Sequence, residues 1–572
     1  MAAQAASARP NVVVILTDDQ GWGDLSCNGN TNLSTPNIDG LADSGASFES
    51  FIVCPLCAPT RAEFLTGRYY PRTGVHDVTT GGERMNADER TIADSFKAAG
   101  YGTAVFGKWH NGAQGPYHPN ARGFDEFYGF CSGHWGDYFN PLLEHNGQLV
   151  RGQGFAADDF TTHAIEFIEL HRHQPFFVYL ALNTPHSPMQ VPDQWFDRFR
   201  NRALLLRGTD ETAEDLAHTR AALAMCENID DNVGRLLSRL DELQLAEQTI
   251  VVYFSDNGPN GARWNGGMRG IKGSLDEGGV RSPLFIRWPG MIEPGKRVAQ
   301  LSGAIDLFPT LVDLADVPRV GDKPLDGESL KPALLDSSGR THDRSIYSTW
   351  GDNASVRTQR FRLDNQGRLY DLEHDRSQGR DVSGKFPSVA ADLRAQVARW
   401  KREVVPAAQP DSRPFIVGFP GSRITMLPAA DGQPHGDIQR SNQYPNSSYF
   451  TNWTSSDDSI TWDVDVSQDG AYRAVIYYTC AKADVGATLE LRLGDHSISA
   501  VVARPHDPPL LGGEHDRVPR QESYIKDFAP LDIGILKLPR GRGQLTLSAL
   551  DIPGKHVIDF SLLTLQRVES DD

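Results

Sequence analysis

Several features that would restrict the class of this protein are missing from its sequence. The 572 residues contain no apolar run close to the ~18 residues of a membrane span. Acidic residues outnumber basic ones by 74 to 56, and the formal charge of −18 is unlike the basic footprint of nucleic-acid binding. Six cysteines are too scattered for a dense disulfide framework. We therefore expect a globular protein with no membrane span and no nucleic-acid partner.

The first ten residues also lack the apolar core of a signal peptide, and a strand pattern already begins at Asn11. We expect a periplasmic or extracellular origin, with an export signal that has been removed from this chain. A cytoplasmic protein is the alternative.

Short, continuous apolar runs alternate with longer helical patterns from residue 11 to about 405. The runs are typical of strands buried on both faces, and they cover 11–16, 103–106, 175–182, 249–254 and 283–288. Helical patterns lie between them, at 91–99, 158–171, 213–243 and 304–315. This alternation predicts an α/β fold with a largely parallel central sheet and helices on both sides. Ligands of such sheets bind beyond the carboxyl ends of the strands.

The pattern divides the chain into three parts. Residues 11–340 form the main α/β domain, and short polar strands followed by a helix at 388–403 make 341–405 a small antiparallel subdomain. A Pro- and Ala-containing linker spans 405–410. The remaining part, 411–572, has short alternating strands and predicts a β-sandwich. Its strands are expected at 460–464, 472–478, 487–493, 535–538, 544–549 and 557–565.

Four aromatic residues of this sandwich have two interpretations: Trp453, Trp462, Tyr477 and Tyr478. They form either a sugar-stacking face, which would make the sandwich carbohydrate-binding, or part of its core, which is the more frequent case for aromatic side chains.

Oxygen-bearing side chains follow two of the expected strands. Asp18 and Asp19 come directly after the first strand, and Asp256 and Asn257 follow the strand at 249–254. Each pair alone is equally compatible with a turn or a helix cap. Two such pairs at the carboxyl ends of two strands predict an all-oxygen site for a hard divalent cation, Ca²⁺ or Mg²⁺.

Basic residues and histidines follow other expected strands. Lys108 and His110 follow the strand at 103–106, and His186 follows the strand at 175–182. Arg269 and Lys272 lie in a glycine-rich loop, which taken alone is a flexible loop with a solvated lysine.

A cysteine motif links these blocks. Cys57-Ala-Pro-Thr-Arg61 has proline at +2 and arginine at +4 and is followed by Leu65-Thr-Gly67. Together with DDQGWGD, GKWH, TPH, SDNG, EGG-x-R-x-P and LYDLEHD, it resembles the type I sulfatases in motif and in order. The resemblance runs from residue 11 to about 405. Thr60 stands where the commonest signature has serine, and it keeps the hydroxyl group.

This resemblance implies an alkaline-phosphatase-like α/β sandwich fold and a sulfuric ester hydrolase. Cys57 would be converted by a formylglycine-generating enzyme to formylglycine, whose hydrated form attacks sulfur. The metal, Ca²⁺ with Mg²⁺ as the alternative, would be held by Asp18, Asp19, Asp256, Asn257 and the modified Cys57. The catalytic set would be Cys57, Arg61, Lys108, His110, His186 and Lys272. Substrate contacts would come from Lys108, His186 and Lys272, from Ser132 or His134, and from Trp135 and Arg269.

Substrate class is less constrained by the sequence. The appended sandwich and the acidic composition favour sulfated polysaccharide fragments, and the segments 134–138 and 263–265 offer either a sugar subsite or loop packing. Two alternatives stay open. One is a formylglycine-dependent phosphonate monoester or phosphodiester hydrolase, and the other is an inert carbohydrate-binding protein with an unmodified Cys57.

Overall fold

The computed structural model describes residues 9–336, 341–405 and 411–568. The expected linker at 405–410 lies outside these ranges except for its first residue. No helix within them is both long enough and apolar enough to cross a membrane.

A ten-stranded sheet forms the centre of the molecule, in the order β12-β2-β11-β9-β1-β8-β4-β5-β6-β7. Its outer strands are β12 (Lys296–Val298) and β2 (Ala46–Phe48) at one end, and β6 (Leu142–His145) and β7 (Gln148–Arg151) at the other. Its middle is parallel and comprises β9 (Thr249–Ser255), β1 (Asn11–Thr17), β8 (Phe176–Ala181), β4 (Gly102–Lys108) and β5 (Glu126–Phe130). The predicted strands are confirmed. One refinement concerns β11 (Leu284–Arg287), which runs antiparallel to β9.

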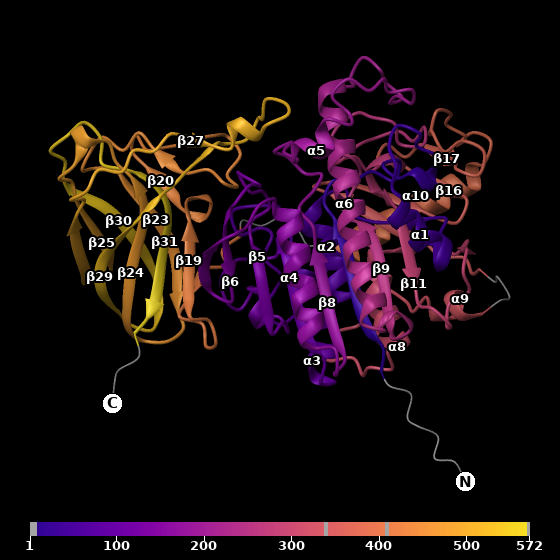
Figure 1. Cartoon of the computed structure of the whole chain (residues 1–572), viewed down its shortest axis with the longest axis horizontal. Helices are drawn as coiled ribbons and strands as arrows, with labels where there is room; N and C mark the ends of the chain where they lie inside the picture. Colours follow the sequence, from indigo (N-terminus) through magenta and orange to yellow (C-terminus); the bar gives the residue numbers. More distant parts are fainter. Residues whose placement is uncertain (1–8, 337–340, 406–410, 569–572) are drawn as a thin grey trace, which may run out of the picture.

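Helices cover both faces of this sheet (Figure 1). One face packs against α1 (Pro36–Ser44), α4 (Ala156–Leu170) and α6 (Leu216–Glu242). The other packs against α2 (Cys57–Thr66), α3 (Ile92–Ala98) and α8 (Leu307–Leu314). The strand residues alternate between the two cores, so that Val12 and Val14 face one side while Val13 and Ile15 face the other. Two-sided burial explains why these strands read as continuous apolar runs.

Two further β structures follow. A four-stranded antiparallel sheet, β14 (Ile346–Trp350), β15 (Asn353–Arg357), β16 (Phe361–Leu363) and β17 (Leu369–Asp371), is accompanied by α10 (Pro387–Val404), as predicted. Beyond it stand two six-stranded sheets, which Figure 1 shows in orange and yellow beside the α/β part.

The strands of the first of these two sheets are β18 (Phe415–Val417), β20 (Gln433–His435), β23 (Ser459–Val466), β25 (Thr488–Leu493), β26 (His496–Val501) and β30 (Gly541–Asp551). Those of the second are β19 (Ile424–Pro428), β21 (Gln439–Arg440), β22 (Phe450–Thr451), β24 (Gly470–Thr479), β29 (Ala529–Leu538) and β31 (Asp559–Arg567). One hydrophobic core joins them. Trp453, Trp462 and Tyr478 are buried in that core. Their burial supports the core interpretation for these three residues, whereas Tyr477 is half-buried and lies outside that core.

Helix α2 is buried over its whole length, which makes its one acidic residue unusual. Glu63 accepts a hydrogen bond from the Tyr70 amide at 3.2 Å, and burial raises the pKa of Glu63 to about 8. The folded state therefore keeps a proton on this carboxyl group at neutral pH.

Glu63→Gln should change how stability depends on pH. Because the folded pKa lies above the unfolded value, Glu63 lowers the free energy of unfolding by ~1.4 kcal/mol per pH unit as the pH rises from about 4.5 toward 8. The glutamine variant removes this contribution. The free energy of unfolding of the variant, relative to that of the wild type, should therefore increase as the pH rises. Urea unfolding at pH 5, 6.5 and 8 measures it, with exposed Glu247→Gln as the control. Equal pH slopes for Glu63→Gln and the wild type would contradict the assignment.

Candidate active site

The carboxyl ends of four parallel strands bring the predicted motifs together. β9, β1, β8 and β4 are consecutive in the sheet. Asp18 follows β1 and Asp256 follows β9, while Lys108 ends β4 and His186 lies five residues beyond β8. This edge is where the sheet topology places a ligand.

The acidic residues form one buried cluster. A ligand atom of Asp18, one of Asp256 and the Cys57 sulfur all lie within 4.8 Å of one another. The Asn257 amide donates to the Asp19 carboxylate at 2.8 Å. Asp18 Oδ1 and Asn257 Oδ1 are buried and have no hydrogen-bond partner among the described residues. Buried oxygens are normally satisfied, so two unpaired ones in one cluster fit the ligands of a hard divalent cation.

Three cations border the cluster. Lys108 Nζ lies 2.5 Å from Asp18, and Lys272 Nζ lies 2.7 Å from Asp19. Arg61 pairs with Asp256 at 2.8 Å and donates to the Lys108 carbonyl at 2.7 Å. Three acidic side chains thus lie next to three basic ones.

The two acids closest to Arg61 have opposite pKa shifts. Burial opposes ionisation of Asp18, but the nearby cations, Lys108 first, lower its pKa below the usual range. Burial and then the neighbouring Asp18 carboxylate raise the pKa of Asp256. Additional positive charge at the cluster would therefore favour full ionisation.

Cys57 is the first residue of α2, so the amino terminus of a ten-residue helix faces the cluster. The Thr60 hydroxyl accepts from the Cys54 amide at 2.8 Å and donates to the Asp256 carbonyl at 2.6 Å. The hydroxyl at this position of the motif thus ties the start of α2 to the loop that follows β9.

Three histidines lie around the site. His186 Nδ1 bonds to the Ser187 carbonyl at 2.7 Å, and its Nε2 lies 3.7 Å from Asp19. His110 Nε2 bonds to the Val78 carbonyl at 2.8 Å, which leaves its buried Nδ1 without a partner among the described residues. The ring of His134 lies 5.6 Å from that of His186.

Burial lowers the pKa of each of these histidines. The positive charge of Lys108 lowers the pKa of His110 further, and that of Lys272 does the same at His186. At His134, burial and then the neighbouring His186 lower the pKa to about 3. All three rings are therefore neutral at pH 7.

Asp19 and His110 have left-handed backbone conformations, with φ of 67° and 61°. Such conformations cost about 1–3 kcal/mol each and need support from their surroundings. Arg263 donates to the Asp19 carbonyl at 3.0 Å and pairs with Asp24 at 2.6 Å. Asn265 accepts from the Gly23 amide at 2.7 Å, so the segment 263–265 is loop packing that holds the loop after β1.

Three of the residues predicted to contact substrate pair or pack with other parts of the chain. Ser132 donates to Asn446 of the sandwich at 3.3 Å, and Trp135 stacks on Phe130 at 5.1 Å. Arg269 pairs with Asp276 at 2.8 Å and lies over the Tyr370 ring. No hydrogen bond, ion pair or ring contact joins Trp135 or Arg269 to the cluster within the described residues. Both side chains make packing contacts outside the cluster, and their contact with substrate stays a prediction.

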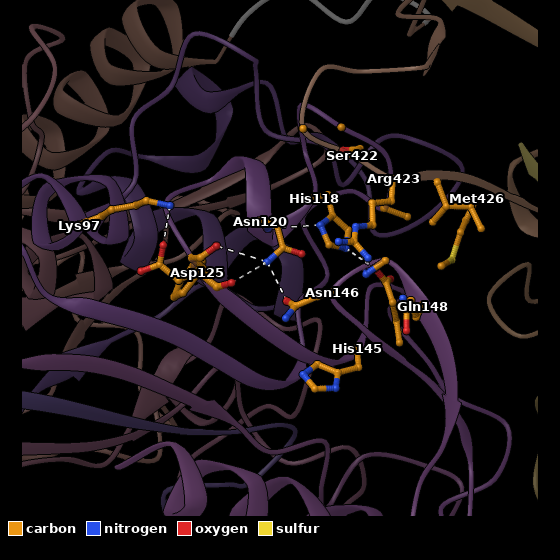
Figure 2. A pocket seen from close by; sticks show the side chains of 17 residues that line it. Lys97, His118, Asn120, Asp125, His145, Asn146, Gln148, Ser422, Arg423 and Met426 are labelled. Atoms are coloured by element: carbon orange, nitrogen blue, oxygen red, sulfur yellow. Dashed lines mark hydrogen bonds and ion pairs between the residues drawn. The ribbon is translucent and has the colours of Figure 1, made fainter. Parts of the chain in front are cut away.

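A polar cavity of about 490 Å³ lies apart from this site, between the strands β6 (Leu142–His145) and β7 (Gln148–Arg151) and the segment 421–426 of the sandwich (Figure 2). Its side chains largely pair with one another: Lys97 with Asp125 at 2.7 Å, and Asn120 with Asn146 at 3.0 Å. It contains none of the predicted site residues.

Comparison with known proteins gives the family. Residues 10–317 match the sulfatase family, and residues 272–403 match a family described as N-sulphoglucosamine sulphohydrolase, C-terminal. The chain belongs to the sulfatase family. This membership makes it a sulfuric ester hydrolase, as predicted. N-acetylgalactosamine-6-sulfatase of Sus scrofa is 34% identical over 387 residues, which cover 61% of this chain and 70% of that protein. Arylsulfatase A of Homo sapiens is 32% identical, over 63% of this sulfatase and 76% of the human one.

Solved structures agree with this fold. Ps i-CgsB, crystallised with k-i-k-neocarrahexaose, is 30% identical with a TM-score of 0.64, over 71% of this chain and 95% of its own. The phosphonate monoester hydrolase of Agrobacterium radiobacter shares the fold with a TM-score of 0.52 at 20% identity, over 69% of this chain and 96% of its own. The matched families end at residue 403, so the β-sandwich lies outside them.

Calcium should stabilise the wild type through this cluster, and Asp18→Asn should abolish the effect. A ligand that binds only the folded state adds ~2.7 kcal/mol at about 100 times its dissociation constant. The thermal midpoint with and without Ca²⁺, after treatment with chelator, measures this. Exposed Asp43→Asn is the control and should keep the wild-type response. The same calcium-induced rise in Asp18→Asn would argue against the metal assignment.

Proposed function

We propose that this sulfatase hydrolyses sulfate esters of carbohydrates, with Cys57 converted to formylglycine and a divalent cation, Ca²⁺ or Mg²⁺, held by Asp18, Asp19, Asp256 and Asn257. The buried, unpartnered oxygens of Asp18 and Asn257 carry the metal part of the proposal. The modified Cys57 would supply the attacking hydroxyl group, and the cation would draw charge from the sulfate oxygens.

Three basic side chains serve the sulfate group. Arg61, Lys108 and Lys272 surround the cluster from α2, from β4 and from the glycine-rich loop. Fixed positive charges stabilise an anionic centre whose charge redistributes during transfer, and in a buried site this contribution is usually the largest. Their convergence supports an anionic ester as the substrate.

The two histidines have different roles. His186 keeps its proton on Nδ1 through the Ser187 carbonyl, so its neutral Nε2 faces the cluster as a hydrogen-bond acceptor. The proton for the departing alcohol oxygen would come from the Lys272 ammonium group, which stays charged beside Asp19. His110 donates from Nε2 to Val78, and its free Nδ1 can accept a proton. Its lowered pKa keeps this nitrogen unprotonated at neutral pH.

The carbohydrate assignment is supported by the relatives. N-acetylgalactosamine-6-sulfatase is 34% identical, and a structure at 30% identity contains k-i-k-neocarrahexaose. A phosphonate or phosphodiester hydrolase is the second candidate, because a phosphonate monoester hydrolase shares this fold.

Two esters with one leaving group separate these candidates. With protein co-produced with a formylglycine-generating enzyme, turnover of 4-nitrophenyl sulfate should exceed that of the phosphate ester, and N-acetylgalactosamine 6-sulfate should release sulfate. A preference for the phosphate ester would favour the second candidate. Saccharide binding without any sulfate release would favour the alternative of an inert carbohydrate-binding protein with an unmodified Cys57.

Cys57→Ser should reduce turnover by about 10³-fold or more, because an unmodified serine lacks the second hydroxyl group of the hydrated aldehyde. Cys54→Ser is the matched control, three residues away and also buried, and should keep its activity. Steady-state rates over many turnovers measure both. Normal turnover by Cys57→Ser would refute the nucleophile, and equal losses in both variants would point to a fold defect.

A further inference from the structure

One segment of the β-sandwich reaches the active-site side of the α/β part. Residues 512–524 connect β27 (Leu510–Leu511) to β28 (Ile525–Lys526), and Figure 1 shows this yellow segment extending toward the α/β domain. It lies outside the matched sulfatase families, which end at residue 403.

The segment is held by buried polar contacts. Gln190, which is fully buried, donates to the Gly512 carbonyl at 2.7 Å and to Asp516 at 3.0 Å. Arg520 donates to the Gly136 carbonyl at 2.5 Å while pairing with Asp516, also at 2.5 Å. Buried groups satisfied on both sides fix the segment in one position.

This segment places a carboxylate beside the histidines. The Ser187 hydroxyl donates to Glu522, and Ser187 Oγ lies 3.5 Å from His186 Nδ1. Partial burial opposes ionisation of Glu522, but hydrogen bonds from the Ser187 hydroxyl and from its own backbone amide lower its pKa. The carboxylate is therefore ionised at neutral pH. Through Ser187 it lies on the Nδ1 side of His186, whereas His186 Nε2 faces the acidic cluster.

A second segment of the sandwich, residues 446–447, contacts the same side of the active site. Asn446 accepts from the Thr79 hydroxyl at 3.0 Å and donates to the Val78 carbonyl, the same carbonyl that His110 contacts. Ser447 donates to the His134 carbonyl at 2.8 Å. The sandwich thus contacts the surroundings of both His110 and His134.

We propose that the β-sandwich forms part of the saccharide-binding wall of the active site, with Glu522 accepting hydrogen bonds from hydroxyl groups of the sugar that bears the sulfate. This inference rests on the proposed function. The acidic cluster and the cations beside it would bind the sulfate group. The Glu522 carboxylate, beyond His186, would contact the sugar, which is the alcohol part of the ester. A carboxylate accepts hydroxyl or amino donors and repels a second sulfate or a carboxyl group. The substrate class is accordingly a singly sulfated sugar that is neutral at the position facing Glu522.

Selectivity between a sugar and an aryl ester tests the assignment. Glu522→Ala should lower the ratio of kcat/KM for N-acetylgalactosamine 6-sulfate to that for 4-nitrophenyl sulfate by about tenfold or more, since a hydrogen bond to a charged group is lost. Glu522→Gln keeps an acceptor and removes the charge. It should raise kcat/KM for N-acetylgalactosamine 4,6-disulfate relative to the 6-sulfate by about tenfold.

Glu514→Gln, an exposed site in the same segment, is the matched control and should keep both ratios. Equal losses on both esters in Glu522→Ala, or no change in either ratio, would overturn the proposal.

Binding separates this proposal from the proposed function. If the matured wild type releases sulfate from neither ester, the proposed function fails. Calorimetric binding of N-acetylgalactosamine 6-sulfate to the wild type and to Glu522→Ala then decides. Weaker binding by the variant supports the subsite, and equal binding overturns it.

Discussion

Packing three carboxylates into one buried cluster is the constraint on which the rest of the site depends. Isolated buried charges are strongly disfavoured, so Asp18, Asp19 and Asp256 require compensating groups close by. Arg61, Lys108 and Lys272 provide that compensation from three different parts of the chain. The central sheet brings the acidic residues together, because β1 and β9 are neighbours whose carboxyl ends meet at one edge, and Lys108 ends β4 at the same edge. Arg61 reaches this edge from α2, and Lys272 reaches it from the glycine-rich loop.

Much of this arrangement was predictable from the sequence. The central strands are buried on both faces, so they appear as continuous apolar runs, and polar residues after Thr17 and Ser255 necessarily gather at the sheet edge. Strand direction was not encoded in this way: β11 has the same apolar pattern but runs antiparallel to β9. The strands β5 to β7 were missed because they are short, and because the burial of β6 and β7 is mixed.

Other features depend on long-range docking, which local patterns do not contain. Arg263 supports the strained Asp19 backbone from a position 244 residues away in sequence, and Glu522 meets Ser187 across 335 residues. Glu522 stands in a polar segment with no motif, so only the docked sandwich reveals its place. Within the α/β part, tertiary contacts also place two sequence neighbours in different surroundings. His134 lies beside His186, whereas Trp135 packs on Phe130. The sandwich thus has a structural relation to the active site that its strand pattern alone did not indicate.

The measurement that tests the central claim most directly is the mass of the proteolytic peptide containing Cys57, from protein produced together with a formylglycine-generating enzyme. The expected result is the mass of the aldehyde at residue 57, which would provide the nucleophile next to the acidic cluster. A peptide with only the unmodified thiol, from protein that releases no sulfate, would contradict it and favour a saccharide-binding protein on a sulfatase fold.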